Sequence, residues 1–110
     1  MTTKKKTSKT EKLLEALRSG DEYVRHGAAG NPNATPEVLL VALEDEDACV
    51  RRIAAANPNI KSLNLSTERW LELVANGAFE GSLKNIPHHV KKDPRYKSSR
   101  LLSQLAKAPS

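Results

Sequence analysis

The sequence predicts an all-α protein, a short α-solenoid of about two and a half helix-pair repeats that ends in a capping helix. The first observation is an internal repeat, because residues 21–33 return as residues 47–59 at a constant offset of 26. The same offset carries the apolar segment 13–17 onto 39–43. Apolar residues three and four apart in these segments line one face of a helix. Each unit is therefore a pair of helices that buries its core against its neighbours.

Punctuating residues set the expected ends of the helices. The predicted pairs span about 10–18 and 21–30, then about 36–44 and 47–56. Thr35 is expected to act as an N-cap ahead of proline at the first helical position. Asp21 and Asp47 are placed to cap the second helix of each pair. That helix ends where proline disfavours the helical conformation of the preceding residue; the pairs concerned are Asn31-Pro32 and Asn57-Pro58.

The third unit is altered by an insertion. Leu39 corresponds to Trp70 at an offset of 31 instead of 26, so five residues are added within 60–65. A helix over about 66–74 is expected, then a short helix with Phe79 and Leu83 on one face. The last helix, about 97–107, is expected to cap the stack, as terminal units often do; its apolar residues are Leu101, Leu102 and Leu105.

The charges divide the chain into three parts. We expect a basic N-terminal arm at 1–9, a helical repeat domain at 10–87 and a basic C-terminal segment with the terminal helix at 88–110. The predicted units of the repeat domain are about 10–33, 34–59 and 60–87. Residues 21–60 hold seven acidic and three basic side chains, whereas residues 83–110 hold seven basic and one acidic. The two ends are thus either solubilising tails or contacts for an acidic partner.

Composition narrows the class of protein. With 38% hydrophobic and 4% aromatic residues, the core must be aliphatic and rich in alanine. No apolar run approaches the roughly 18–20 residues of a membrane span, and no apolar stretch follows the charged N-terminus. A single cysteine excludes an internal disulfide. We therefore expect a soluble, cytoplasmic protein without a membrane partner.

The repeated string Val-Arg-x-x-Ala-Ala-x-Asn-Pro-Asn, with Thr-Pro-Glu-Val-Leu between its copies, resembles the variant leucine-rich repeat. The resemblance covers about residues 10–75. It implies a right-handed superhelix of alternating helices, close to HEAT repeats, and an interaction scaffold without a defined activity. Some relatives carry a cysteine-rich iron–sulfur segment, which a chain with only Cys49 cannot supply.

Two sets of cations are candidate contacts. The basic ends offer phosphate or partner contacts at Lys4, Lys5, Lys6, Lys9, Lys91, Lys92, Arg95, Lys97 and Arg100. The repeat surface offers a row of cations at Arg25, His26, Arg51 and Arg52. The alternative for the equivalent Arg25 and Arg51 is a structural ladder, in which each pairs with an acid such as Asp21 or Asp47. Tyr96 stacks on a base or, as we prefer, holds the last helix in place.

No motif predicts catalysis, a metal site or a cofactor. The histidines, at 26, 88 and 89, lack the spacing of a metal motif. Cys49 is expected to be a packed, partly buried thiol. The acidic turn 44–47 does not match a calcium loop and is expected to be solvated. We find neither a nucleophile motif nor a phosphate loop.

Two functions from different classes remain. The first is a non-enzymatic adaptor or structural component that docks on a larger macromolecular assembly through its repeat surface and basic ends, with a protein as partner. The alternative is a nucleic-acid-binding protein that contacts phosphates through those ends. Self-association is also open, because a short array has two exposed ends.

Overall fold

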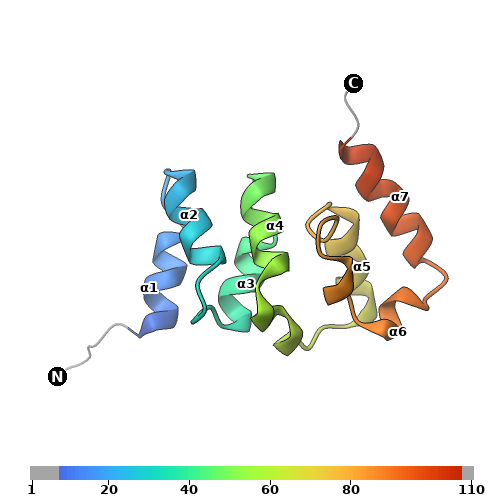
Figure 1. Ribbon diagram of the computed structural model, residues 1–110, viewed down its shortest axis with the longest axis horizontal. Helices are drawn as coiled ribbons and strands as arrows, with labels where there is room; N and C mark the ends of the chain where they lie inside the picture. The colour runs from blue at the N-terminus through green and yellow to red at the C-terminus, as the bar shows by residue number, and fades with distance from the viewer. Residues whose placement is uncertain (1–7, 108–110) are drawn as a thin grey trace.

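The computed structural model describes residues 8–107 of the chain, and all of the regular structure in this stretch is helical (Figure 1). This confirms the all-α prediction. The α-helices and 3-10 helices are α1 (Lys9–Ala16), α2 (Glu22–Ala29), α3 (Pro36–Ala42), α4 (Ala48–Ala56), η1 (Pro58–Ser62), α5 (Thr67–Ala75), η2 (Leu83–Asn85), α6 (His88–Lys91) and α7 (Tyr96–Lys107). Within the described stretch, no helix is both long enough and apolar enough to cross a membrane.

The first four helices form two pairs that lie side by side (Figure 1). Helix α1 packs against α3, and α2 packs against α4, so each unit covers the next. The interior is aliphatic and alanine-rich, as predicted; its fully buried members on α3 and α4 are Val38, Leu39, Ala42, Val50, Ala54 and Ala55. Helix α5 follows the two pairs, and α7 packs on α5.

The predicted caps are mostly confirmed. The side chains of Asp21 and Asp47 each accept a hydrogen bond of 2.9 Å from the backbone N–H two residues later. Such bonds satisfy donors that the first turn leaves open. Thr35 differs, because it occupies the N-cap position with no side-chain capping bond. Its buried Oγ1 has no hydrogen-bond partner in the described stretch.

Asparagine side chains join the units at the Asn-Pro turns. Two asparagines of the second unit donate from their amides to four backbone oxygens that end α2 and form the turn after it. The bonds run from Asn57 Nδ2 to Ala29 and Asn31, both 3.0 Å, and from Asn59 Nδ2 to Pro32 at 2.9 Å and Ala34 at 3.0 Å. These bonds hold the second unit in register with the first.

The third unit keeps its first helix but not its second. Helix α5 matches the predicted one, and Trp70 on it is buried. The short helix predicted through Phe79 and Leu83 is wrong: turns fill residues 76–81, and the 3-10 helix η2 follows. Gly77 lies in the left-handed region (φ 89°), which breaks a helix at its start. Phe79 is nevertheless fully buried, against Trp70.

The asparagine contact survives the loss of that helix. Asn85 Nδ2 donates to the backbone oxygen of Ala55 at 2.9 Å. Ala55 lies one 26-residue offset after Ala29, the acceptor of Asn57. Asn85 is therefore the equivalent of Asn57 in the third unit.

The C-terminal segment contains one unpredicted element, the short helix α6, before α7 begins one residue earlier than expected. The buried side of α7 is polar: Ser99 and Ser103 face the interior, and Ser103 Oγ donates to Glu80 Oε2 at 2.7 Å. The leucines of α7 point outward instead, with exposures of 59% for Leu101, 57% for Leu102 and 68% for Leu105. The inward side of α7 therefore consists of these serines and the half-buried Tyr96, while its three leucines stay more than half exposed.

Candidate functional site

Arg25 is a structural residue rather than a surface cation. Its Nε lies 3.0 Å from Asp45 Oδ2, and its Nη1 donates to the backbone oxygen of Ser19 at 2.7 Å. The side chains of Arg25 and Asp45 are only 11% and 9% exposed. The ladder interpretation holds here, but the acid is Asp45 and not Asp21 or Asp47.

Arg51 repeats part of this contact one unit later. Its Nη1 donates to the backbone oxygen of Asp45 at 2.6 Å, which is the Arg25–Ser19 bond moved by one repeat. The prediction of an acidic partner for Arg51 is wrong, because Arg51 donates to the backbone oxygens of Asp45 and Glu46. Its Nε is buried without a hydrogen-bond partner in the described stretch. The acidic turn is also not simply solvated, since Asp45 is held inside it by Arg25.

The C-terminal cations fall into two groups. Arg95 is paired with Asp93 at 2.9 Å, and Arg100 is paired with Glu80 at 3.2 Å. In contrast, three exposed lysines, Lys91, Lys92 and Lys97, make no ion pair with any residue in the described ranges. Lys9 is exposed at the start of α1, whereas Lys4, Lys5 and Lys6 lie outside the described residues. Tyr96 is half-buried against the core, as expected for a residue that holds α7.

The Asp93–Arg95 pair predicts a measurable titration. Hydrogen bonds from the Arg95 side chain, followed by its backbone N–H, lower the pKa of Asp93 from 3.8 to about 2. A lowered folded-state pKa stabilises the fold above pH 3.8, and this contribution is lost as the pH falls toward 2. We expect Arg95→Gln to raise the pKa of Asp93 toward its ordinary value, as measured by NMR titration of the carboxyl carbon. An unchanged pKa in that variant would contradict the pairing.

The outward side of α7 borders a groove against α5. Leu71, Ala75 and Leu102 form its apolar lining, and Glu68 and Glu72 lie along it. The cavity has a volume of about 330 Å³. This groove and the exposed Leu101 and Leu105 of the same helix are here called the α7 surface.

A second cavity lies where the inserted residues separate the second and third units. Its walls include the buried side chains of Ile60, Trp70 and Ile86, and its volume is about 310 Å³. Lys61, Lys84 and His88 also line it, with no carboxylate among the lining residues. Sequence reasoning missed Lys61 and Lys84 as neighbours; the insertion at 60–65 was the only signal that the packing changes there.

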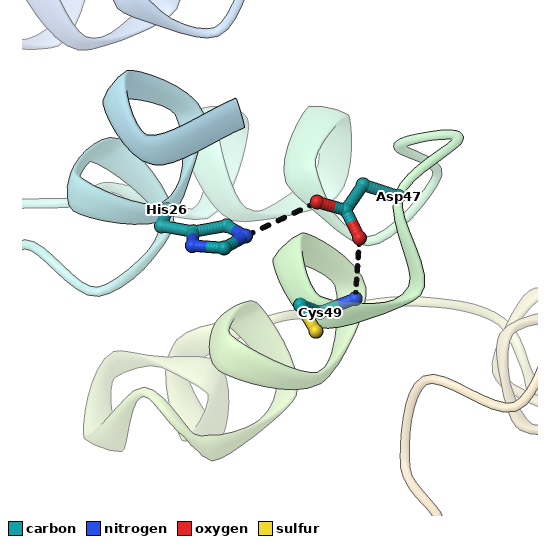
Figure 2. A group of neighbouring side chains, drawn as sticks. All are labelled: His26, Asp47 and Cys49. Carbon is teal, nitrogen blue, oxygen red and sulfur yellow. Dashed lines mark hydrogen bonds and ion pairs between the residues drawn. The ribbon is translucent and has the colours of Figure 1, made fainter. Parts of the chain in front are cut away.

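Three side chains of residue types that can bind a metal lie close together at the junction of the first two units (Figure 2). His26 comes from α2, Asp47 precedes α4, and Cys49 lies in its first turn. His26 Nε2 is 3.1 Å from Asp47 Oδ2, and the potential ligand atoms of the three residues lie within 4.8 Å of one another. Cys49 is exposed, so the prediction of a packed thiol is wrong.

The electrostatics of this junction keep Asp47 ionised. The hydrogen bond from the backbone N–H of Cys49, with a smaller effect from His26, lowers the pKa of Asp47 below its usual value. Arg52 points Nη2 toward Cys49 Sγ at 4.0 Å. Of the predicted row of cations, His26 belongs to this cluster and Arg52 lies beside it, whereas Arg25 and Arg51 are held by structural contacts.

Comparisons with known proteins do not identify the chain. No protein-family model matches it, and no curated protein or solved structure shows a match either.

Proposed function

We propose that the chain is a non-enzymatic helical-repeat interaction module that docks a protein partner within a larger assembly. In this proposal the helix pairs form a short right-handed solenoid of the variant leucine-rich repeat type, with α7 as the cap. The constant offset of 26 and the Asn57 contact between units support the repeat. The buried ladder contact of Arg25 moves the expected docking surface from the repeat cations to the C-terminal end.

The observation that carries the proposal is the outward leucine side of α7. Leu101, Leu102 and Leu105 are each more than half exposed, while Ser99 and Ser103 of the same helix are buried. Burying a leucine side chain stabilises a complex or a fold by about 1.5–3 kcal/mol. A helix that leaves three leucines in water and covers its own protein with serines gains that stabilisation only when another surface covers it.

The chemistry of the α7 surface favours one kind of partner. The apolar groove between α5 and α7 fits side chains spaced at i, i+3 and i+4 on an amphipathic helix. Glu68 and Glu72 on its α5 side are paired with Arg95 and Arg69, so the edge of the groove presents ion pairs and not free carboxylates. The partner proposed here is therefore an amphipathic helix with leucine-like residues on one face and polar residues beside them.

A three-residue variant tests this docking. We expect the combined change Leu101→Gln, Leu102→Gln and Leu105→Gln to weaken partner binding at least about 100-fold, because three leucine contacts are lost. Far-UV circular dichroism should be unchanged, since these side chains are exposed in the free chain. The measurement is affinity capture with cross-linking mass spectrometry, followed by titration of the captured protein.

A matched control keeps the result specific. Val41 on α3 is 48% exposed and apolar but far along the chain from α7, so Val41→Gln should leave binding intact. Support requires cross-links on α7, loss of the same protein in the triple variant, and its retention by Val41→Gln. A chain that stays alone, or a partner that both variants retain equally, would reject the α7 surface.

Nucleic-acid binding through the basic ends is the second candidate, favoured by the unpaired Lys91, Lys92 and Lys97 noted above. Phosphate contacts make affinity fall with salt, with a slope close to the number of neutralised phosphates. Changing these three lysines to glutamine should reduce the slope against log salt by about 2–3 for duplex DNA. Absent binding at low salt, or a slope that the change leaves untouched, would remove this candidate.

A further inference from the structure

We infer that His26, Asp47 and Cys49 form a three-ligand site for a transition-metal dication of the zinc type, at the junction of the first two units. The residues supply one nitrogen, one oxygen and one sulfur, a donor set that suits Zn²⁺ or Co²⁺. Nothing in the sequence spacing suggests this site, because its ligands come from two different repeats (Figure 2).

The separations fit a tetrahedral metal. Bonds of about 2.0–2.2 Å to nitrogen and oxygen at tetrahedral angles place two ligand atoms roughly 3.3–3.6 Å apart. The observed distance from His26 Nε2 to Asp47 Oδ2 is 3.1 Å, close to this value. Cys49 Sγ lies within 4.8 Å of both other ligand atoms, and the sulfur moves closer to them when all three share a metal. The fourth position faces solvent beside the exposed Cys49 and would hold water or a partner's ligand.

The protonation states and charges of the three side chains also suit a bound dication. The Cys49 backbone N–H bonds to Asp47 Oδ1, which leaves Oδ2 for a metal. The dication would replace the thiol proton of Cys49, which goes to solvent, and would bind a neutral His26. One thiolate and one carboxylate then balance the charge of the metal.

The repeat itself marks this junction as unusual. In the first unit, the position of Cys49 is occupied by Tyr23, and the position of His26 is occupied in the second unit by Arg52. At this junction a histidine and a cysteine lie within 4.8 Å of one carboxylate, and among the described residues no other such group of three occurs. A plain contact between His26 and Asp47 would need no third ligand at position 49.

The neighbouring charges decide how tightly a metal is held. Arg52 lies 4.0 Å from the sulfur and is the cation that opposes a bound dication most directly. Arg25 is also near Asp47, but its charge is balanced by Asp45. Removing the positive charge of Arg52 should therefore tighten metal binding at this site.

Titration of the reduced full chain with Co²⁺ tests the site. We expect one Co²⁺ per chain, visible d–d bands of tetrahedral intensity, and a thiolate-to-cobalt charge-transfer band in the near ultraviolet that Zn²⁺ displaces. Cys49→Ser should abolish the charge-transfer band. His26→Gln and Asp47→Asn should each weaken binding at least tenfold, and Arg52→Gln should strengthen it about threefold or more.

Controls separate the site from other causes. Asparagine is a good N-cap, so Asp47→Asn is expected to keep α4 folded, which circular dichroism checks. His89→Gln removes a histidine that is exposed at the C-terminal end and should change nothing. The inference is overturned if no charge-transfer band forms, if the band is equally strong in His26→Gln and Asp47→Asn, or if each metal requires two chains.

Discussion

Replacing Asp45 with alanine is expected to lower the free energy of unfolding by about 3–5 kcal/mol, because it leaves the Arg25 guanidinium buried without its counter-charge. The two side chains are about nine-tenths buried and 3.0 Å apart. Asp45 Oδ1 also accepts from the backbone N–H of Asp47 at 2.9 Å, so the variant loses a turn contact as well. For a small domain this is a large part of the total stability. The measurement is urea unfolding followed by far-UV circular dichroism.

The repeat offers a matched control for this variant. Ser19 occupies the position of Asp45 one unit earlier, and its Oγ accepts the equivalent bond, from the backbone N–H of Asp21 at 3.0 Å. Ser19→Ala therefore removes the turn contact but no ion pair, and it should cost about 1 kcal/mol. The double change Arg25→Met with Asp45→Leu should restore much of the stability lost in Asp45→Ala, because no charge stays buried. Equal losses in Asp45→Ala and Ser19→Ala would show that the ion pair contributes nothing.

Replacing Asn57 with alanine is expected to lower the free energy of unfolding by about 2–4 kcal/mol. The variant removes two 3.0 Å bonds to the oxygens of Ala29 and Asn31, and the first of these is buried between the units. A buried acceptor left without a partner costs about 1–3 kcal/mol beyond the lost bond. Urea unfolding, read by circular dichroism and by the single tryptophan, Trp70, is the measurement.

Asn31 is the natural control for Asn57. Its Oδ1 accepts the local bond from the backbone N–H of Asn33 at 2.8 Å, as Asn57 does from Asn59 at 2.9 Å. Asn31 has no preceding unit among the described residues to which its amide could donate, so Asn31→Ala should cost under about 1 kcal/mol. If the two variants lose the same stability, the local turn and not the contact between units is what matters.

The sequence predicts those parts of the fold that local chemistry determines. A constant offset with apolar residues at i, i+3 and i+4 was enough to place the helices of the first two units and α5. The same pattern did not predict the loss of the second helix in the third unit. Phe79 and Leu83 have helical spacing, yet the left-handed conformation of Gly77 turns the chain and leaves Phe79 to reach the core from a turn.

Which side of α7 faces the rest of the protein was harder to predict than the helix itself. Leu101, Leu102 and Leu105 mark α7 as amphipathic, but the pattern does not say which side meets the protein. Ser103 turns inward because Glu80 accepts its hydroxyl at 2.7 Å, and the leucines then face outward. That contact joins residues 23 positions apart, so no local pattern contains it.

The candidate sites show the same limit. The equivalence of Arg25 and Arg51 left a structural ladder and a surface row open, and Arg25 makes a structural contact with Asp45, in a turn that was expected to be solvated. The cluster of His26, Asp47 and Cys49 forms only where the first two units pack against each other. Within either unit alone, the spacing of these residues does not indicate a metal site.

The bond from Asn85 to Ala55 has a consequence for how such a chain tolerates change in length. Unit three has gained five residues and lost a helix, yet one side-chain amide still reaches the same place on the unit before it. The contact that the second and third units share is thus an asparagine amide bonded to the end of the preceding helix, and it does not depend on the presence of the second helix of the unit. The five residues inserted within 60–65 open a cavity between the second and third units, yet the amide contact persists, so this contact tolerates a change of length that the surrounding packing does not.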